Sequence, residues 1–276
     1  MSPTQSHPEG EIIAPTHPEQ PAEAYTPEQA RRHREYSVWD PRSAPGTYFL
    51  MAINIGVYLW MIAHHVNPKL PSDWALLHYG ANEPWLVLHG QWYRLLTATF
   101  VHVGLIHLAT NMWCLWNLGL LGEPLLGPLG LVAVYMLTGI AGNLLSLGWN
   151  VVMRDYISVG AGASGAVFGI AGILIVLLSN HKLPIPVYEL KRLRRSVIQF
   201  AALNLIIGLG TAIVPVGIRI DNSAHLGGFL FGLALGVPLV PRMTSGRTRY
   251  LQRQKIAFTG AAFFLALFGY WVANLH

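Results

Sequence analysis

Charge is what this sequence has least of. Only 11% of its 276 residues are Asp, Glu, Lys or Arg, whereas 53% are hydrophobic and the mean hydropathy is +0.41. Soluble domains carry roughly 25% charged residues. The 18 basic and 13 acidic side chains are therefore too few to cover a water-facing surface of this size. The composition predicts a polytopic membrane protein.

Cysteine is nearly absent, and the glycines are not periodic. One Cys excludes a disulfide scaffold, and 28 Gly without a three-residue period exclude collagen. No phosphate-loop motif occurs, and we expect no nucleotide, metal or redox cofactor. No signal or transit peptide is evident near Met1. The pI near 9.4 does not by itself indicate nucleic-acid binding, because basic residues in membrane proteins mark the cytoplasmic side.

Acidic residues and proline concentrate at the start of the chain. Residues 1–46 hold seven of the 13 acidic residues and eight of the 18 Pro, so they cannot bury enough apolar area to fold alone. We expect residues 1–46 to form a disordered cytoplasmic tail. A membrane core over residues 47–241 should follow, and then a cytoplasmic loop and a last span over residues 242–276.

Seven apolar segments after the tail each approach the roughly 20 residues that a membrane-spanning helix needs. They are about Thr47–Val66, Ala98–Leu121, Leu129–Trp149, Val159–Leu178, Val197–Pro215, Ala224–Val240 and Ala257–Ala273. The sequence therefore predicts an all-α polytopic membrane protein with seven spans.

Lys and Arg are distributed unevenly between the connecting segments. Fourteen of the 18 lie before the first span, after the fourth or after the sixth, all on one side of an alternating topology. Loops rich in Lys and Arg stay cytoplasmic, so the N-terminus should be cytoplasmic. On the opposite side, the segment from His65 to about Leu96 is rich in Trp and Leu. We expect it to be a partly embedded loop with short helices.

Polar side chains inside spans are costly in lipid and therefore indicate function. They are His102, His107 and Asn111 in the second predicted span and His225 at the start of the sixth. His107 and Asn111 are four residues apart and share one helix face. Such residues could instead hydrogen-bond helices together. The three His could also ligate a metal, although no carboxylate or thiolate completes that site.

A glycine-rich stretch opens the fourth span, and Ser164 lies where its helix should begin. About 16 residues run from Ser164 to Ser179, or roughly 24 Å of helix, against about 30 Å of hydrocarbon. Ser164 should then lie below the outer surface, beside the free N–H groups of a helix N-terminus, where a developing oxyanion is stabilised. The small residues Gly165 and Gly169 also suit close helix packing.

The sixth span supplies a base for this serine. Gly228 and Gly232 form a stripe of small residues that can meet the glycines of the fourth span. Close approach would bring His225 within hydrogen-bonding reach of Ser164, and an imidazole can take a serine proton near neutral pH. Because no acidic residue lies in a nearby span and Asp221 is in a loop, a Ser–His dyad is the simplest interpretation.

Four separated motifs resemble the rhomboid family of intramembrane serine proteases, in the order in which that family has them. They are Gln91-Trp92-Tyr93-Arg94, His102 to Asn111, Gly162-Ala163-Ser164-Gly165, and Ala224-His225-Leu226-Gly227-Gly228. The resemblance implies a six-helix catalytic core with one added C-terminal helix. It implies Ser164 as the nucleophile and His225 as the general base. His107, Asn111 and the Ser164 N–H would form the oxyanion site.

The resemblance has further implications outside these motifs. The fifth span and the loop around Val216–Ser223 would control substrate access. Glu123 falls where the family commonly has a structural Glu, but Leu125 stands where some relatives have its partner Arg, so another pairing or none is expected. Phe168 stands where some members have a Tyr that stacks on the His, and a Phe should keep that stacking.

Together these observations predict a serine endopeptidase that cleaves transmembrane segments of other membrane proteins near the outer face of the bilayer. No nucleic-acid partner is expected. The charge bias and the lack of a transit peptide favour a bacterial plasma membrane, with a eukaryotic secretory-pathway membrane left open. Two other functions are compatible with the same residues. One is a transporter or channel that uses the histidines, and the other is a rhomboid-like protein that binds membrane clients without cleaving them.

Overall fold

Helices account for all the regular structure that is described. The structure is a computed structural model and describes residues 40–180, 183, 185–213, 220–240 and 246–275. In these ranges strand-like pairing is limited to one isolated bridge between Asn82 and Gly160. The helices are α2 (Pro45–Ala63), α3 (Asp73–His78), α4 (Pro84–Leu88), α5 (Arg94–Thr97), the 3-10 helix η1 (Ala98–Phe100), α6 (Leu105–Leu126), α7 (Pro128–Met153), α8 (Ser164–Leu177), α9 (Val187–Ile213), α10 (Asn222–Leu239) and α11 (Arg247–Ala273). The all-α class is confirmed.

Several helices are long and apolar enough to cross a membrane. Among the described residues these are α2, α7, α10 and α11, and a fifth if α5, η1 and α6 count as one span bent by 93°. α8 is apolar but has only 14 residues. The seven spans therefore stay a prediction. Of the predicted tail, residues 1–39 lie outside the described ranges, whereas its last two residues, Pro45 and Gly46, belong to α2.

The second predicted span, about Ala98–Leu121, is not one continuous helix. Its helix, α6, begins at Leu105 rather than near Ala98, because Gly104 has φ +131° and ends the preceding extended segment. A Cβ at Gly104 would also lie 2.5 Å from the Lys69 carbonyl oxygen. His102, which we expected inside the span, precedes the helix.

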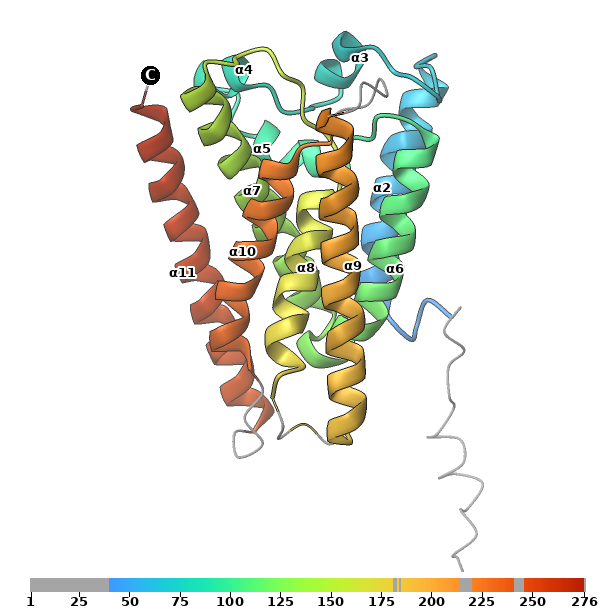
Figure 1. Cartoon of the computed structure of the whole chain (residues 1–276), viewed down its shortest axis with the longest axis vertical. Coiled ribbons are helices and arrows are strands. Elements are labelled where there is room, and N and C mark those ends of the chain that lie inside the picture. Colours follow the sequence, from blue (N-terminus) through green and yellow to red (C-terminus); the bar gives the residue numbers. More distant parts are fainter. Residues whose placement is uncertain (1–39, 181–182, 184, 214–219, 241–245, 276) are drawn as a thin grey trace, which may run out of the picture. The chain divides into compact units, whose positions relative to one another are not determined.

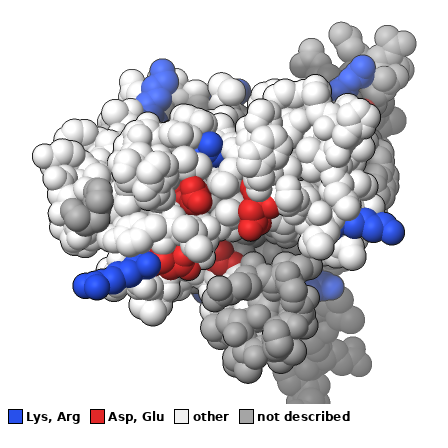
Figure 2. Space-filling model, turned by 90° about the horizontal axis from the view of Figure 1, so that it is seen from above, with Lys and Arg blue, Asp and Glu red and all other residues white. Residues whose placement is uncertain are grey.

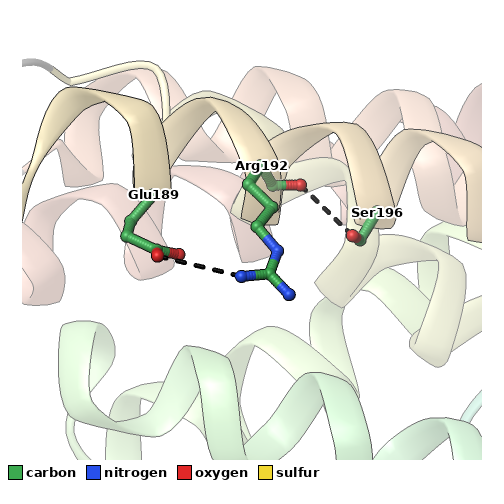
Figure 3. A network of polar contacts seen from close by, with 3 residues as sticks. All are labelled: Glu189, Arg192 and Ser196. Carbon is green, nitrogen blue, oxygen red and sulfur yellow. Dashed lines mark hydrogen bonds and ion pairs between the residues drawn. The ribbon is translucent and has the colours of Figure 1, made fainter.

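Two helices begin earlier than hydropathy predicted. α9 begins at Val187 and α11 at Arg247, each ten residues before the apolar segment that identified it. The added turns are polar, and on α9 Glu189 pairs with Arg192 at 3.8 Å while Ser196 Oγ donates to the Arg192 carbonyl (Figure 3). Pairs of charged side chains can stabilise the part of a helix that lies in water. A search for apolar segments therefore finds only part of each helix.

α8 is the most buried helix, and it packs against α10, α7, α6 and α9 (Figure 1). α10 approaches it backbone to backbone. A Cβ built on Gly228 would lie well inside 3.0 Å of the Gly165 carbonyl, and one on Gly232 would do the same at Gly169. The predicted contact between the two glycine stripes is confirmed, and it fixes the position of α10 relative to α8.

Glu123 joins two distant helices. Its buried carboxylate, near the end of α6, accepts hydrogen bonds from the N–H groups of Gly46 and Thr47, both at 2.8 Å, and from Thr47 Oγ1 at 2.7 Å. These donors belong to the first turn of α2, which has no N-terminal partner of its own. Glu123 therefore has another pairing in place of an Arg at position 125: its carboxylate binds the N-terminus of α2.

Replacing Glu123 by alanine should destabilise the protein by about 3 kcal/mol, because three buried donors lose a charged acceptor. The free energy of unfolding in mixed detergent measures this effect. Glu189→Ala is the matched control, since Glu189 only pairs with the exposed Arg192 and should cost less than about 1 kcal/mol. Equal costs for the two variants would contradict a special role for Glu123.

α11 contacts the rest of the protein at its N-terminal end through hydrogen bonds. Tyr250 donates its hydroxyl to the Leu125 carbonyl at 2.9 Å, and Gln254 Nε2 donates to the Leu126 carbonyl at 2.8 Å. Both carbonyls belong to the last turn of α6, where no further helical N–H is available. α11 therefore supplies the C-terminal cap of α6.

Candidate active site

Ser164 is the first residue of α8, as the sequence predicted. The 14 residues of α8 reach roughly 21 Å, less than the roughly 30 Å of membrane hydrocarbon. The Ser164 side chain is half-buried, and the first N–H groups of a helix have no acceptor within it. The preceding turn is held in place by Gly162, which has φ +128° and donates its N–H to the Ala98 carbonyl at 2.9 Å.

His107 lies directly against this turn. A Cβ at Gly162 would be 2.5 Å from His107 Cε1 and 3.1 Å from Nε2, so only glycine fits beside the ring. His107 Nδ1 accepts the Val103 N–H at 3.4 Å, which assigns the proton of the neutral ring to Nε2. Asn111 lies one turn further along α6, where its Nδ2 donates to the His107 carbonyl at 2.8 Å. The His107 ring therefore presents an N–H donor beside Gly162, which precedes Ser164 by two residues.

His225 lies in the first turns of α10 and is 5% exposed. Its ring stacks on Phe168, with centroids 4.3 Å apart and planes at 14°, which confirms the stacking expected for a Phe at this position. Since Phe168 is one turn after Ser164, the imidazole lies beside the first turn of α8. No hydrogen bond joins Ser164 and His225 in the described residues, and His225 Nδ1 is buried without a partner there.

Asp221 fixes the start of α10. Its carboxylate accepts the Ala224 N–H at 3.0 Å, the Ser223 hydroxyl, and the Ser146 hydroxyl from α7. The His225 N–H donates to the Asp221 main-chain carbonyl at 3.2 Å. Asp221 thus caps the helix that carries His225. An Asp before a helix is a recognisable cap signal, whereas nothing in the sequence distinguishes Ser146 from the other small residues of α7.

His102 lies next to His107, before the start of α6. It is fully buried, its ring centroid is 5.4 Å from that of His107, and its Nδ1 is 3.3 Å from the Phe100 carbonyl oxygen. In the described ranges, no three His, Cys, Asp or Glu side chains form a group that could hold a metal ion. The metal interpretation of the three histidines therefore receives no support from their arrangement.

A groove of about 670 Å³ runs between α6 and α9. Trp113 and Phe200 contribute aromatic walls, and four polar residues line it: Thr110, Asn117, Ser196 and Asn204. Each of these four donates to a carbonyl of its own helix, so the helices stay intact while polar atoms face the groove. The groove is therefore suited to an extended or helical apolar segment with some polar groups.

The end of the molecule that carries α3 and α4 has few charges. Seen from this end, acidic residues gather toward the middle and Lys and Arg lie mainly at the margins (Figure 2). Arg94 is buried and donates to the carbonyls of Leu77 and Ala81, which holds the segment around α3 and α4 together. Burial raises the pKa of the nearby Glu83 carboxyl, and Arg94 partly offsets this effect.

Comparison with known proteins places the chain in a family. Residues 89–242 match the Rhomboid domain. The chain is 33% identical to rhomboid protease GluP of Bacillus subtilis over 216 residues, 76% of this chain and 39% of GluP. It is 31% identical to rhomboid protease AarA of Providencia stuartii over 210 residues, 70% of this chain and 72% of AarA.

A plant relative shows the same pattern. RHOMBOID-like protein 2 of Arabidopsis thaliana is 37% identical over 184 residues, 65% of this chain and 53% of that protein. The chain thus spans well under half of GluP and about half of the plant relative. The domain match covers more than half of the chain, and with its apolar helices this identifies an integral membrane protein. The chain belongs to the rhomboid family.

Proposed function

We propose that this protein is an intramembrane serine endopeptidase that cleaves transmembrane segments of other membrane proteins with a Ser164–His225 dyad. The observation that carries the proposal is the stacking of His225 on Phe168, one turn from Ser164 at the start of a short buried helix. Two bacterial relatives are named rhomboid proteases, which favours hydrolysis over transport or client binding.

The arrangement accounts for each step of peptide hydrolysis. Ser164 Oγ attacks the scissile carbonyl carbon while His225 takes the hydroxyl proton and later gives it to the leaving amine. His107 Nε2–H, the second Asn111 amide hydrogen and the Ser164 N–H stabilise the oxyanion. Water then releases the acyl group from Ser164, with His225 again acting as the base. No residue of this scheme requires a cofactor.

The α6–α9 groove is the proposed route for the substrate segment. It is lined by the helix that carries His107 and Asn111, so a segment lying in it would approach the oxyanion donors from the side. A substrate must unwind locally to expose a peptide bond. Glycine or proline near the scissile bond should favour cleavage because both weaken helices.

Ser164→Ala should abolish cleavage of a labelled transmembrane peptide by the purified protein in lipid vesicles. Ser179→Ala is the matched control, because Ser179 follows the other end of the same helix and donates to the Ile175 carbonyl. Cleavage by Ser164→Ala at the native rate would disprove the nucleophile assignment. A client-binding protein would bind the peptide without cutting it, and a transporter would not react with serine-directed inhibitors.

His107→Ala and Asn111→Ala should each lower the cleavage rate by about 10²–10³-fold, the usual cost of one oxyanion donor. The melting temperature should change little, since neither side chain bonds to another helix in the described structure. Asn274→Ala is the control, because Asn274 follows α11, lies outside the groove and makes the same kind of bond, to the Tyr270 carbonyl of its own helix. Unfolding of either site variant would instead support a packing role.

We also propose that the α3–α4 end faces outward from the cytoplasm of a bacterium, as the Lys and Arg distribution suggests. Single cysteines can test this in a Cys114→Ser background. An impermeant thiol reagent on intact cells should label Ser72→Cys, on the exposed segment before α3, and should miss Thr248→Cys, on α11. The reverse labelling would invert the orientation and with it the expected side of cleavage.

A further inference from the structure

Phe168 contacts a second aromatic ring besides His225. Its centroid is 6.3 Å from that of Phe200 on α9, with the ring planes tilted by 41°. Phe168 is 5% exposed, so both ring contacts lie in the protein interior. A continuous row of rings therefore runs from α9 through α8 to the imidazole on α10.

Phe200 also lines the groove between α6 and α9. It lies on the part of α9 that is fixed in the core, where Val197 and Ala201 are buried. Further along α9, the side chains of Leu203 and Ile206 are 58% and 65% exposed. Phe200 thus lines the groove and also contacts Phe168, the residue that stacks on His225.

The imidazole needs such support because no acidic side chain orients it. In Ser–His–Asp sites a carboxylate on Nδ1 fixes the ring. Here His225 Nδ1 has no hydrogen-bond partner among the described residues, and the Asp221 carboxylate is occupied by Ala224, Ser223 and Ser146. Stacking on Phe168, with the two ring planes only 14° apart, restricts the plane of the imidazole.

We propose that Phe200 is a positioning residue that holds Phe168, and through it His225, and so links the state of the groove to the readiness of the dyad. This inference rests on the proposed protease function. A substrate segment that presses on Phe200 tightens the row of rings, and loss of the Phe200 ring lets Phe168 and the imidazole rotate. Phe200 therefore affects the chemical step as well as substrate binding.

A small fluorophosphonate separates these two effects, because it reacts at the serine without filling the groove. Ser164 Oγ bonds to phosphorus, fluoride leaves, and His225 accepts the hydroxyl proton. Phe200→Ala and Phe200→Leu should each slow this labelling by about 2- to 12-fold, the rate equivalent of one aromatic pair. Phe200→Tyr should restore it. Leu203→Ala, on the same helix but exposed and outside the lining of the groove, should label at the native rate.

The possible results separate the positioning role of Phe200 from the proposed protease activity. Slower labelling by the two non-aromatic variants with rescue by Phe200→Tyr, and with a similar fall in kcat for a transmembrane peptide, supports the positioning role. Native labelling rates with an altered KM overturn it and leave Phe200 as a wall of the groove. Labelling of Ser164→Ala as fast as the native protein would refute the dyad itself. Phe200→Leu keeps most of the apolar volume, so a fold defect in Phe200→Ala does not decide the question.

Discussion

His225→Ala is expected to lower the rate of peptide cleavage by about 10⁴- to 10⁶-fold, the range found when the base of a serine protease is removed. In the proposed scheme His225 is the group that takes the Ser164 proton near neutral pH, because His107 presents an N–H donor instead. The rate constant kcat on a reconstituted transmembrane peptide measures the loss. His225→Asn should behave in the same way while leaving a side chain of intermediate size against Phe168.

The control for this prediction is His64→Ala. His64 follows α2 and is exposed, and its ring Nδ1 lies 2.8 Å from the Trp60 carbonyl oxygen of its own helix. It should keep the native rate. If a well-folded His225→Ala retained more than about a hundredth of native activity, another group would have to act as the base.

Gly232→Ala should produce the largest loss of stability, by about 3 kcal/mol or more. The added methyl group would meet the Gly169 carbonyl, and a backbone atom in the middle of two packed helices cannot move aside as a side chain can. Chemical or thermal unfolding in detergent measures the change. The displacement would also shift α10, so activity should fall together with stability.

Gly260→Ala is the matched control for the glycine contact. Gly260 lies within α11, and a Cβ there would meet nothing within 4 Å. Alanine favours helix over glycine by about 1 kcal/mol, so this variant should be neutral or slightly stabilised. A similar loss in both variants would mean that helix propensity rather than close packing explains the result.

The parts of the site that the sequence could predict are those with a local pattern. Ser164 begins α8 because the glycine-rich segment before it cannot continue a helix, and glycines spaced four apart indicate a contact face. Phe168 stacks on His225 because helix geometry places it one turn after the serine. The contact between α8 and α10 can then be predicted, because each helix carries its own local pair of glycines.

The parts that could not be predicted depend on distant contacts or on single dihedral angles. Glu123 and Thr47 are 76 residues apart, and no local pattern connects a carboxylate with the helix start that it caps. Hydropathy predicts His102 inside a helix because it does not reveal the positive φ of Gly104. The contact between Phe200 and Phe168 joins α9 to α8, and the sequence of neither helix predicts the angle at which they pack.

The cap that α11 places on α6 has a consequence for the assembly of the protein during translation. Gln254 lies 128 residues after Leu126, so α6 enters the membrane long before its buried terminal carbonyls receive their donors. Until the last helix is synthesised, these carbonyls lack the donors that α11 supplies. A chain cut short before α11 would lack both hydrogen bonds permanently and should unfold more easily in detergent. Completion of the last helix thereby stabilises a helix made much earlier.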